Sequence, residues 1–512
     1  MKKEINQLKA GTLLTYLTMV VSSVIPMLYT PLMLQLLGQD EYGLYSLSSS
    51  VTNYLGLLNL GMGSTILRYY MRYLTEGNKL MAERVMGLFS LLFGIISVAT
   101  MVVGCSLTLF TGSLFAQGLS DAEIAKMNIL VIILSINSGI TLLAAPLGTI
   151  VVGNERYIFQ KISALCFTLA APILNLIVLY MGHASIGIAC VGIVCSIATF
   201  IVDLIYCTKR LRTRPRFKQM PFGILKEVFA FTLVVFMSTI AQLLYWSTDK
   251  VLIGAMIGSA AVAVYNIGIT FNTIMQQLSS AISSVFAPRV NRLVFSEQPI
   301  SAVSELMTRV GRLQYLIISL VLSGFIVFGK AFLGFWVGEG YEEAYPVALL
   351  TMIPMVVPLI QNVAFTAIVA MNKHKFRSNM YLILAVANVA ATYFAIPYFG
   401  IVGAAICTFV VFLLGHGIIM NWFYYKKIGI DIFSFWKNIL KMTIVPTVLT
   451  VAGLLLQHYA FQMDTLLIFA IGVAVYTLIF CALSWLISMN AYEKKLVTDM
   501  LRKVLPKKKS AC

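Results

Sequence analysis

Two carboxylates stand side by side in the stretch LLGQDEYGLYSLSSS, residues 36–50, which lies between two long apolar runs. They belong to Asp40 and Glu41. Paired carboxylates suit general acid and base catalysis, so this pair could serve a membrane-embedded enzyme that transfers lipid-linked sugars. The alternative is that both are solvated charges beside a turn.

A second candidate pair, Asp249 and Lys250, occurs in YWSTDKVLIGAMIG, residues 245–258. Ionisable side chains inside a membrane segment are expensive, which makes both residues functional candidates. Sequence neighbours do not share a helix face, so at most one of them can point squarely at a given surface.

The composition indicates which elements must position these residues. Of the 512 residues, 59% are hydrophobic and 11% are charged, against about 25% charged in ordinary soluble domains. Apolar runs of roughly twenty residues, enough to span a bilayer, recur along the chain. We expect an all-α polytopic membrane protein, because the alternating pattern of barrel strands is missing. The run after MKKEINQLKA is too long for a signal peptide and predicts a retained first helix.

The sequence predicts about fourteen spans. They begin near residues 11, 43, 85, 127, 162, 186, 228, 262, 313, 346, 379, 400, 438 and 465. With both termini in the cytoplasm, the inner segments hold 34 of the 37 Lys and Arg residues, as the positive-inside rule requires. Those segments are 1–10, 67–84, 152–161, 207–226, 288–313, 371–378, 423–441 and 489–512.

The net charge of +17 follows from this distribution. We expect the basic runs at 208–218 and 506–509 to face anionic lipid headgroups, at about 1 kcal/mol per residue, rather than nucleic acid. The eight cysteines and four histidines show no metal-ligand spacing, so we predict neither a metal site nor a cofactor.

Shifting the chain by 220 residues places residues 36–50 on MIGSAAVAVYNIGIT, residues 256–270. The shift keeps a turn glycine and a tyrosine but replaces Asp40 and Glu41 by alanines. We therefore interpret the acidic pair as solvated loop charges and the tyrosines as interfacial, with wet hydroxyls. The glycines are Gly38 and Gly258, and the tyrosines are Tyr45 and Tyr265.

The repeat predicts two parallel halves related by an axis along the membrane normal, with a substrate path between them. The predicted parts are a six-helix bundle at 1–210, a basic cytoplasmic linker at 211–226, a second six-helix bundle at 227–437, an additional helix pair at 438–488 and a basic tail at 489–512.

Several stretches resemble the Wzx-type polysaccharide flippases of the multidrug/oligosaccharidyl-lipid/polysaccharide superfamily. They are the turn-and-tyrosine hairpin, YWSTDKVLIGAMIG, FAPRVNRL at 286–293, FWVGEGYEEAYPVALLTMIP at 335–354 and the apolar stretch at 371–410. The resemblance implies two bundles in a V around a central cavity, and transfer of an undecaprenyl-diphosphate-linked oligosaccharide between leaflets. The extra helix pair is more similar to fourteen-helix peptidoglycan-precursor flippases.

Under this resemblance Lys250 is expected to be a counter-ion for the diphosphate, and Asp249 to join a polar network or couple transport to a cation. The alternative for Lys250 is that it snorkels to the interface and pairs locally. Arginines at the inner mouth could load the diphosphate, although any positive-inside boundary supplies such residues. They are Arg68, Arg72, Arg289 and Arg292.

Polar and aromatic residues on the same helices suit sugar binding, although aromatic belts and helix–helix contacts explain them equally. They are Asn53, Tyr54, Gln242, Tyr245, Trp246, Asn272, Gln276 and Gln277. Prolines interrupt the hydrogen-bond ladders of helices one and ten and are candidate hinges: Pro26, Pro31, Pro354 and Pro358.

The sequence contains no nucleotide-binding loop, so we expect a Na⁺ or H⁺ gradient or the membrane potential to drive transport. Expected partners are the lipid-linked oligosaccharide, membrane lipids, a polysaccharide polymerase and other biosynthesis proteins in a bacterial plasma membrane. Two alternatives stay open: a cation-coupled multidrug exporter of the same superfamily, and a glycosyltransferase that uses Asp40 and Glu41.

Overall fold

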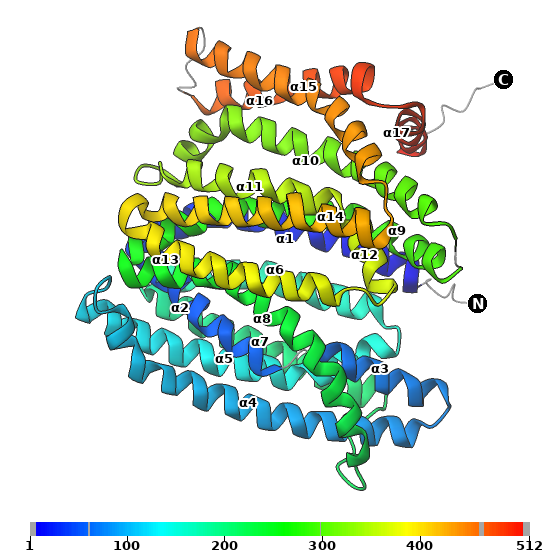
Figure 1. Cartoon of the computed structure of the whole chain (residues 1–512). Helices are drawn as coiled ribbons and strands as arrows, with labels where there is room; N and C mark the ends of the chain where they lie inside the picture. Colours follow the sequence, from blue (N-terminus) through cyan, green and yellow to red (C-terminus); the bar gives the residue numbers. More distant parts are fainter. Residues whose placement is uncertain (1–6, 60–61, 297, 460–464, 505–512) are drawn as a thin grey trace, which may run out of the picture. The chain divides into compact units, whose positions relative to one another are not determined.

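The computed structural model describes residues 7–59, 62–296, 298–459 and 465–504, which fold into helices joined by short turns (Figure 1). Contacts divide the chain into two compact units. The first unit holds Met1–Asn266 and Ser378–Cys407, and the second holds Ile267–Arg377 and Thr408–Cys512. The predicted boundaries of the six-helix bundles stay a prediction.

The first unit is built from long helices and short π and 3-10 turns. They are α1 (Gln7–Leu37), α2 (Gln39–Asn53), η1 (Tyr54–Asn59), α3 (Met62–Thr75), α4 (Lys79–Phe115), α5 (Asp121–Gly153), α6 (Tyr157–Tyr180), α7 (Ala184–Ile205), η2 (Tyr206–Arg210), η3 (Phe222–Ile224), α8 (Leu225–Met256), the start of α9 (Ser259–Phe295) and the middle of α13 (Lys375–Phe412).

Helices α4 and α5 form a long antiparallel pair in this unit (Figure 1). A capping box begins α5: the Ser120 side chain accepts from the Glu123 amide, and the Glu123 carboxylate accepts from the Ser120 amide. Buried aromatic residues of α4, including Phe89 and Phe93, pack with Ile66 of α3. This cluster holds α3, α4 and α5 together.

The second predicted span is not one continuous helix. The 15 residues of α2 are followed by a 3-10 stretch, η1, before α3 begins. A prediction from hydropathy averages over many residues and does not detect a short 3-10 interruption. For this reason the sequence predicted a single span.

The second unit begins at Ile267, within α9, and holds the rest of that helix. It contains α10 (Ile300–Val337), α11 (Ala344–Ile360), α12 (Asn362–Ala370), η4 (Leu413–Met420), α14 (Asn421–Phe423), η5 (Tyr424–Ile428), α15 (Ile432–Tyr459), α16 (Leu466–Leu483), η6 (Ser484–Ser488) and α17 (Ala491–Val504).

The chain bends by 50° between α11 and α12. The bend lies at Gln361, three residues after Pro358, whose carbonyl accepts from the Gln361 amide at 3.3 Å. Proline cannot continue the hydrogen-bond ladder, which explains the position of the break. By contrast, α1 runs through Pro26 and Pro31 as one helix. A hinge function for any of these prolines stays a prediction.

Helical structure extends over 54 residues from Lys375 to Ile428, about 80 Å if straight, which is too long for one crossing of a hydrocarbon core of about 30 Å. It reverses at Gly400, where φ is 57° and ψ is −143°. After the reversal, Phe423 near its end stacks on Phe376 near its start, with ring centroids 4.3 Å apart. The stretch is therefore a hairpin of two helices, as the predicted starts at 379 and 400 require.

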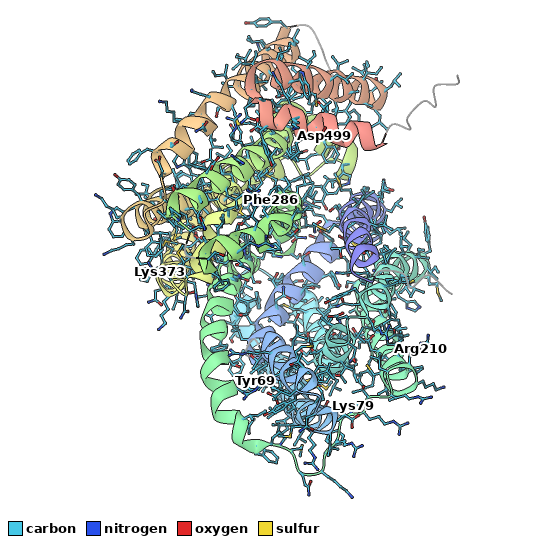
Figure 2. The ribbon with its side chains drawn as sticks, turned by 90° about the vertical axis from the view of Figure 1, so that its right-hand side faces the viewer. Tyr69, Lys79, Arg210, Phe286, Lys373 and Asp499 are labelled. Carbon is cyan, nitrogen blue, oxygen red and sulfur yellow. The ribbon has the colours of Figure 1, made fainter. Side chains whose placement is uncertain are left out.

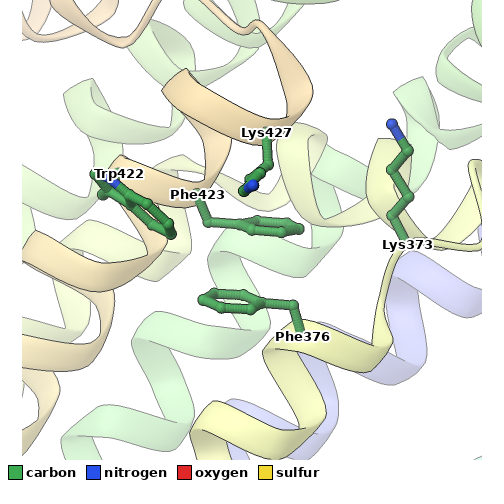
Figure 3. Close-up of a pocket in the computed structure, with 5 residues that line it drawn as sticks. All are labelled: Lys373, Phe376, Trp422, Phe423 and Lys427. Atoms are coloured by element: carbon green, nitrogen blue, oxygen red, sulfur yellow. The ribbon is translucent and has the colours of Figure 1, made fainter.

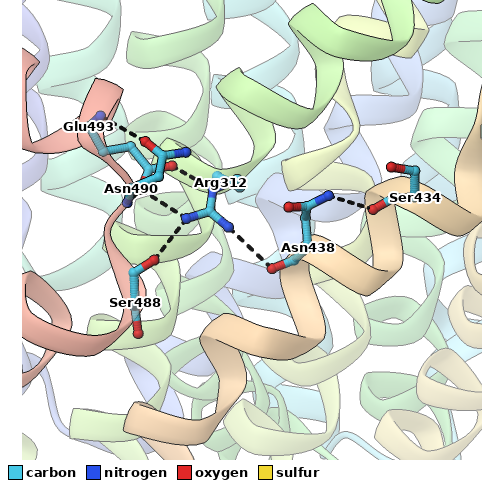
Figure 4. Close-up of polar contacts among 6 residues, drawn as sticks. All are labelled: Arg312, Ser434, Asn438, Ser488, Asn490 and Glu493. Atoms are coloured by element: carbon cyan, nitrogen blue, oxygen red, sulfur yellow. Dashed lines mark hydrogen bonds and ion pairs between the residues drawn. The ribbon is translucent and has the colours of Figure 1, made fainter.

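A buried ion pair attaches α17 to α10 (Figure 4). The Arg312 guanidinium donates to both carboxylate oxygens of Glu493, at 2.6 and 2.9 Å. It also donates to the Ser488 carbonyl at 2.8 Å and to the Asn438 carbonyl at 3.4 Å. Glu493 forms a capping box with Asn490 as well, so one carboxylate both begins the helix and anchors it.

Among the described residues, nine helices are long and apolar enough to span a membrane, and the bent pair α11–α12 would be a tenth. Their outer faces are apolar: Leu28 of α1 is 69% exposed and Leu109 of α4 is 80% exposed. Apolar surface on this scale requires lipid around it. The chain is a multi-pass membrane protein, while the count of fourteen spans, the parallel repeats and the cytoplasmic termini stay predictions.

Two segments predicted to be cytoplasmic meet in the first unit. Lys79 donates to the backbone carbonyl of Arg212 at 3.3 Å, and Figure 2 shows Lys79 and Arg210 at the end of the helices that faces the viewer. The segments 67–84 and 207–226 therefore belong to the same end of this unit, as their shared positive charge predicts.

Candidate transport site

The candidate pair on α8 contacts the start of α9 through two successive hydrogen bonds. Asp249 accepts from the Tyr265 hydroxyl at 2.8 Å, and Lys250 donates to the Asn266 side chain at 3.1 Å. The two neighbours thus bind different partners, as the prediction from helix geometry required.

Asp249 is 3% exposed and lies among neutral polar groups. Besides Tyr265, its carboxylate accepts from the Asn388 amide at 3.3 Å and from the Thr392 hydroxyl at 3.4 Å. Asn388 and Thr392 are one helical turn apart on α13, so both face Asp249. A buried carboxylate that accepts from two hydroxyls and one amide nitrogen can bind a proton or a hard cation through its own oxygens.

Lys250 is linked through Asn266 to α2. The Asn266 amide donates to the Tyr42 hydroxyl at 2.6 Å, so Lys250, Asn266 and Tyr42 form a continuous polar chain across three helices. Beyond the end of α2, at the start of η1, the Tyr54 hydroxyl lies 2.6 Å from that of Thr248. Lys250 and Tyr54, which the sequence suggested for cargo binding, thus both lie at contacts of α8, with Asn266 and with Thr248 respectively. Cargo binding stays a prediction for both.

Close backbone approach positions these helices. A Cβ atom on Gly43 of α2 would lie 1.8 Å from the carbonyl oxygen of Ser259, so only glycine fits where α2 crosses the start of α9. The turns before α2 and α9 use Gly38 and Gly258, with φ of 80° and 135°. The expectation of turn glycines at both places is confirmed.

The two neighbouring carboxylates, Asp40 and Glu41, lie in different environments. Asp40 is exposed, as predicted, but the prediction of a solvated Glu41 is wrong. Glu41 forms an ion pair with Lys126 of α5 and accepts from the Ser185 hydroxyl of α7 at 2.6 Å. Because it joins three helices, Glu41 acts as a packing contact at this end of the unit.

The expectation of an interfacial Tyr265 with a wet hydroxyl is also wrong, because this residue is 2% exposed and binds Asp249. The basic linker is only partly free for lipid. Arg216 pairs with the Glu83 carboxylate at 2.7 Å, and a Cβ on Gly87 would lie 1.9 Å from the Arg216 carbonyl oxygen. The linker is therefore docked on α4. The basic run 506–509 lies outside the described residues.

The four arginines predicted at the inner mouth are exposed. Arg72 pairs with Glu76 of its own helix, at 3.4 Å. Arg68 and Arg72 belong to the first unit, Arg289 and Arg292 to the second. Their joint role in loading stays a prediction.

The remaining predicted residues lie in varied surroundings. Tyr245 is buried against the edge of the Tyr381 ring, with centroids 6.3 Å apart. In the second unit, Asn272 is 2% exposed. Sugar binding is a prediction for each of them. Trp246 and Gln277 are half-buried, and Asn53, Gln242 and Gln276 are exposed.

A family model described as "Polysaccharide biosynthesis protein" matches residues 8–294, more than half of the chain. The chain belongs to the polysaccharide biosynthesis protein family. The resemblance that the sequence motifs indicated is thereby confirmed.

Relatives and solved structures agree with this family. The "Uncharacterized membrane protein EpsK" of Bacillus subtilis (strain 168) is 22% identical over 422 residues, which cover 80% of this chain and 82% of that protein. The lipid II flippase MurJ, in an inward closed conformation, has a TM-score of 0.71 at 14% identity, covering 95% of this chain and 99% of that chain. An inward-facing multidrug resistance MATE family transporter of the MOP superfamily has a TM-score of 0.61 at 16% identity, covering 82% and 99%. The two structures share the fold with this member of the polysaccharide biosynthesis family.

Sequence reasoning missed Asn388 and Thr392, which complete the surroundings of Asp249. Both lie in the apolar stretch AVANVAATYF, and two polar residues four apart on an otherwise apolar helix were the available signal. Their partner is 139 and 143 residues away, so the sequence could suggest a buried polar face but not what it contacts.

Proposed function

We propose that this protein is a secondary transporter that flips an undecaprenyl-diphosphate-linked oligosaccharide from the inner to the outer leaflet by alternating access, for surface polysaccharide assembly. The observation that carries the proposal is the polar site on α8, where Asp249 and Lys250 lie in adjacent, separately hydrogen-bonded positions. Family membership and the fold shared with a lipid II flippase support it.

In this proposal Lys250 supplies positive charge to the diphosphate, and Asn266 and Tyr42 orient its ammonium group. Charge-assisted bonds to phosphate oxygens are strong where water is scarce. Asp249 provides the coupling site: binding of Na⁺ or H⁺ among Tyr265, Asn388 and Thr392 would change the contact between α8, α9 and α13. The gradient then drives the change of access.

The test is mass spectrometry of lipid-linked saccharides in a strain depleted of this protein, with a side-specific probe for the leaflet that holds them. We expect an undecaprenyl-linked oligosaccharide to accumulate on the inner face and the wild-type gene to reverse this. Lys250→Gln should fail to reverse it. The matched control is Lys330→Gln, because Lys330 belongs to the second unit and lies over the Tyr345 ring at 5.4 Å.

A second candidate is a cation-coupled multidrug exporter, because the fold is shared with a MATE family transporter. If the protein is such an exporter, its depletion would leave the lipid intermediates unchanged and would make the strain sensitive to cationic drugs. The two findings together would contradict the flippase proposal. The lysine at position 250 favours an anionic cargo over a cationic one.

A further inference from the structure

A pocket of 410 Å³ opens in the second unit where the two ends of the helical hairpin Lys375–Ile428 meet (Figure 3). Lys373 and Phe376 line it from the beginning of the hairpin, and Trp422, Phe423 and Lys427 line it from the end. The pocket shares no residue with the α8 site. Its lining combines two lysine side chains with three aromatic side chains.

The aromatic residues form a preorganised apolar floor. The rings of Phe376 and Phe423 stack with an interplanar angle of 5°, and Trp422 lies with its ring centroid 6.3 Å from that of Phe376. Phe423 is 6% exposed, whereas Trp422 is 48% exposed. The floor is thus fixed on one side and open to the surroundings on the other.

Both lysines are placed by helix ends. The backbone amide of Lys373 donates to the Ile368 carbonyl and that of Asn372 to the Val369 carbonyl, a Schellman-type end of α12 with Asn372 at a φ of 56°. Lys427 lies in the π-helical turn η5, which ends at Gly429 with a φ of 88°. Within the part of the chain that the structure describes, neither lysine has an ion-pair partner.

Charge and polarity together indicate the ligand. Two cations beside an aromatic floor, in segments whose charge predicts the cytoplasmic side, match a phosphodiester headgroup joined to acyl chains. A volume of 410 Å³ is of the order of ligand sites and accommodates a headgroup rather than a diphosphate-linked oligosaccharide. We propose that this pocket binds the anionic headgroup of a membrane phospholipid, with Lys373 and Lys427 on the phosphate and Trp422 against the acyl region.

Trp422 provides the reporter for the test. The full-length protein is placed in phosphatidylcholine nanodiscs, and part of the lipid is replaced by phosphatidylglycerol with brominated acyl chains, which quench tryptophan fluorescence on contact. Brominated phosphatidylcholine is titrated in parallel, and the signal of Trp422→Phe is subtracted to remove the other four tryptophans. The ratio of the two quenching midpoints measures the preference for the anionic lipid.

We expect a preference of roughly twentyfold for phosphatidylglycerol, from a few-fold per lysine, and its loss in the double variant Lys373→Ala/Lys427→Ala. The matched control is Lys437→Ala/Lys441→Ala, which removes the same charge from exposed positions of the predicted inner segment 423–441, to which Lys427 also belongs. It should keep the preference within about twofold.

Equal quenching by the two lipids would overturn the proposal. An equal loss of the preference for phosphatidylglycerol in the control variant would overturn it as well. So would displacement of phosphatidylglycerol by millimolar pyrophosphate but not by sulfate, because the site would then recognise a diphosphate. The measurement involves no flipping, so its outcome is independent of the proposed transport function.

Discussion

At the scale of single residues, Asp249 is the group on which the proposed coupling depends. Tyr265, Asn388 and Thr392 come from two other helices to hold one carboxylate at 3% exposure. Burying a charge is costly unless hydrogen bonds compensate, so this arrangement preserves a titratable or cation-binding group in the protein interior.

Asp249→Asn should lower flipping about tenfold, because hydrogen bonds to a charged group contribute roughly 1.5–3 kcal/mol, and should remove its dependence on Na⁺ or pH. The measurement is flipping of a labelled lipid-linked saccharide in proteoliposomes with imposed gradients. Asp203→Asn on α7 is the matched control and should respond to the gradient as wild type. An Asp249→Asn protein that keeps its gradient response would contradict the coupling role.

Glu41→Gln should destabilise the protein by about 1 kcal/mol, because it breaks a half-buried ion pair, whereas Asp40→Asn should have almost no effect. The reason is that Glu41 binds Lys126 and Ser185 while Asp40 is exposed. Thermal unfolding of the detergent-purified variants measures the difference. The same two variants test catalysis, since loss of a sugar-transfer activity in Asp40→Asn would favour the enzyme alternative.

At the scale of elements, the crossing of α2 over α9 depends on one missing side chain. Gly43→Ala should destabilise the protein by about 1–3 kcal/mol, as overpacking does, because a Cβ there meets the Ser259 carbonyl. Gly94→Ala in α4 is the matched control, since a Cβ at Gly94 has nothing within 4 Å. Comparable unfolding temperatures for the two variants would show that the helices adjust freely.

The anchor of α17 is a further element-scale feature. Glu493→Gln should destabilise the second unit by about 3 kcal/mol, because it leaves the Arg312 guanidinium buried without a carboxylate. The exposed pair Arg309–Glu305 lies on the same helix, α10, and Glu305→Gln should cost less than about 1 kcal/mol. Limited proteolysis near residue 490 reports release of α17. Equal cleavage of both variants would refute the anchoring role.

The sequence predicted helices well and their interruptions less well, for a physical reason. Apolar length determines whether a segment spans a bilayer, and that is a local property. The break at Gln361 coincides with a proline signal, but the 3-10 stretch at Tyr54 carries no such signal. The candidate site was also predictable only in part. Asp249 and Lys250 are conspicuous because they interrupt an apolar run, whereas the partners Tyr265 and Asn388 are determined by packing between helices that are distant in the sequence.

At the scale of the whole molecule, the distribution of basic residues predicts which loops face the cytoplasm. In a variant without native cysteines, Gln219→Cys should react with a membrane-impermeant maleimide only after the cells are opened. Glu342→Cys should react in intact cells. The expectation follows from the seven basic residues of segment 207–226 and the acidic loop at 338–345. The opposite pattern would invert the predicted topology.

The contact between Arg312 and Glu493 also has a consequence for biosynthesis. The ribosome makes Arg312 181 residues before its carboxylate, and chains are synthesised from the N-terminus onward. Until α15, α16 and α17 are in place, this arginine lacks the Ser488, Asn438 and Glu493 oxygens that surround it in the folded protein (Figure 4). A chain that terminates early or fails to insert its last helices therefore carries an uncompensated charge on α10 that the finished molecule does not have.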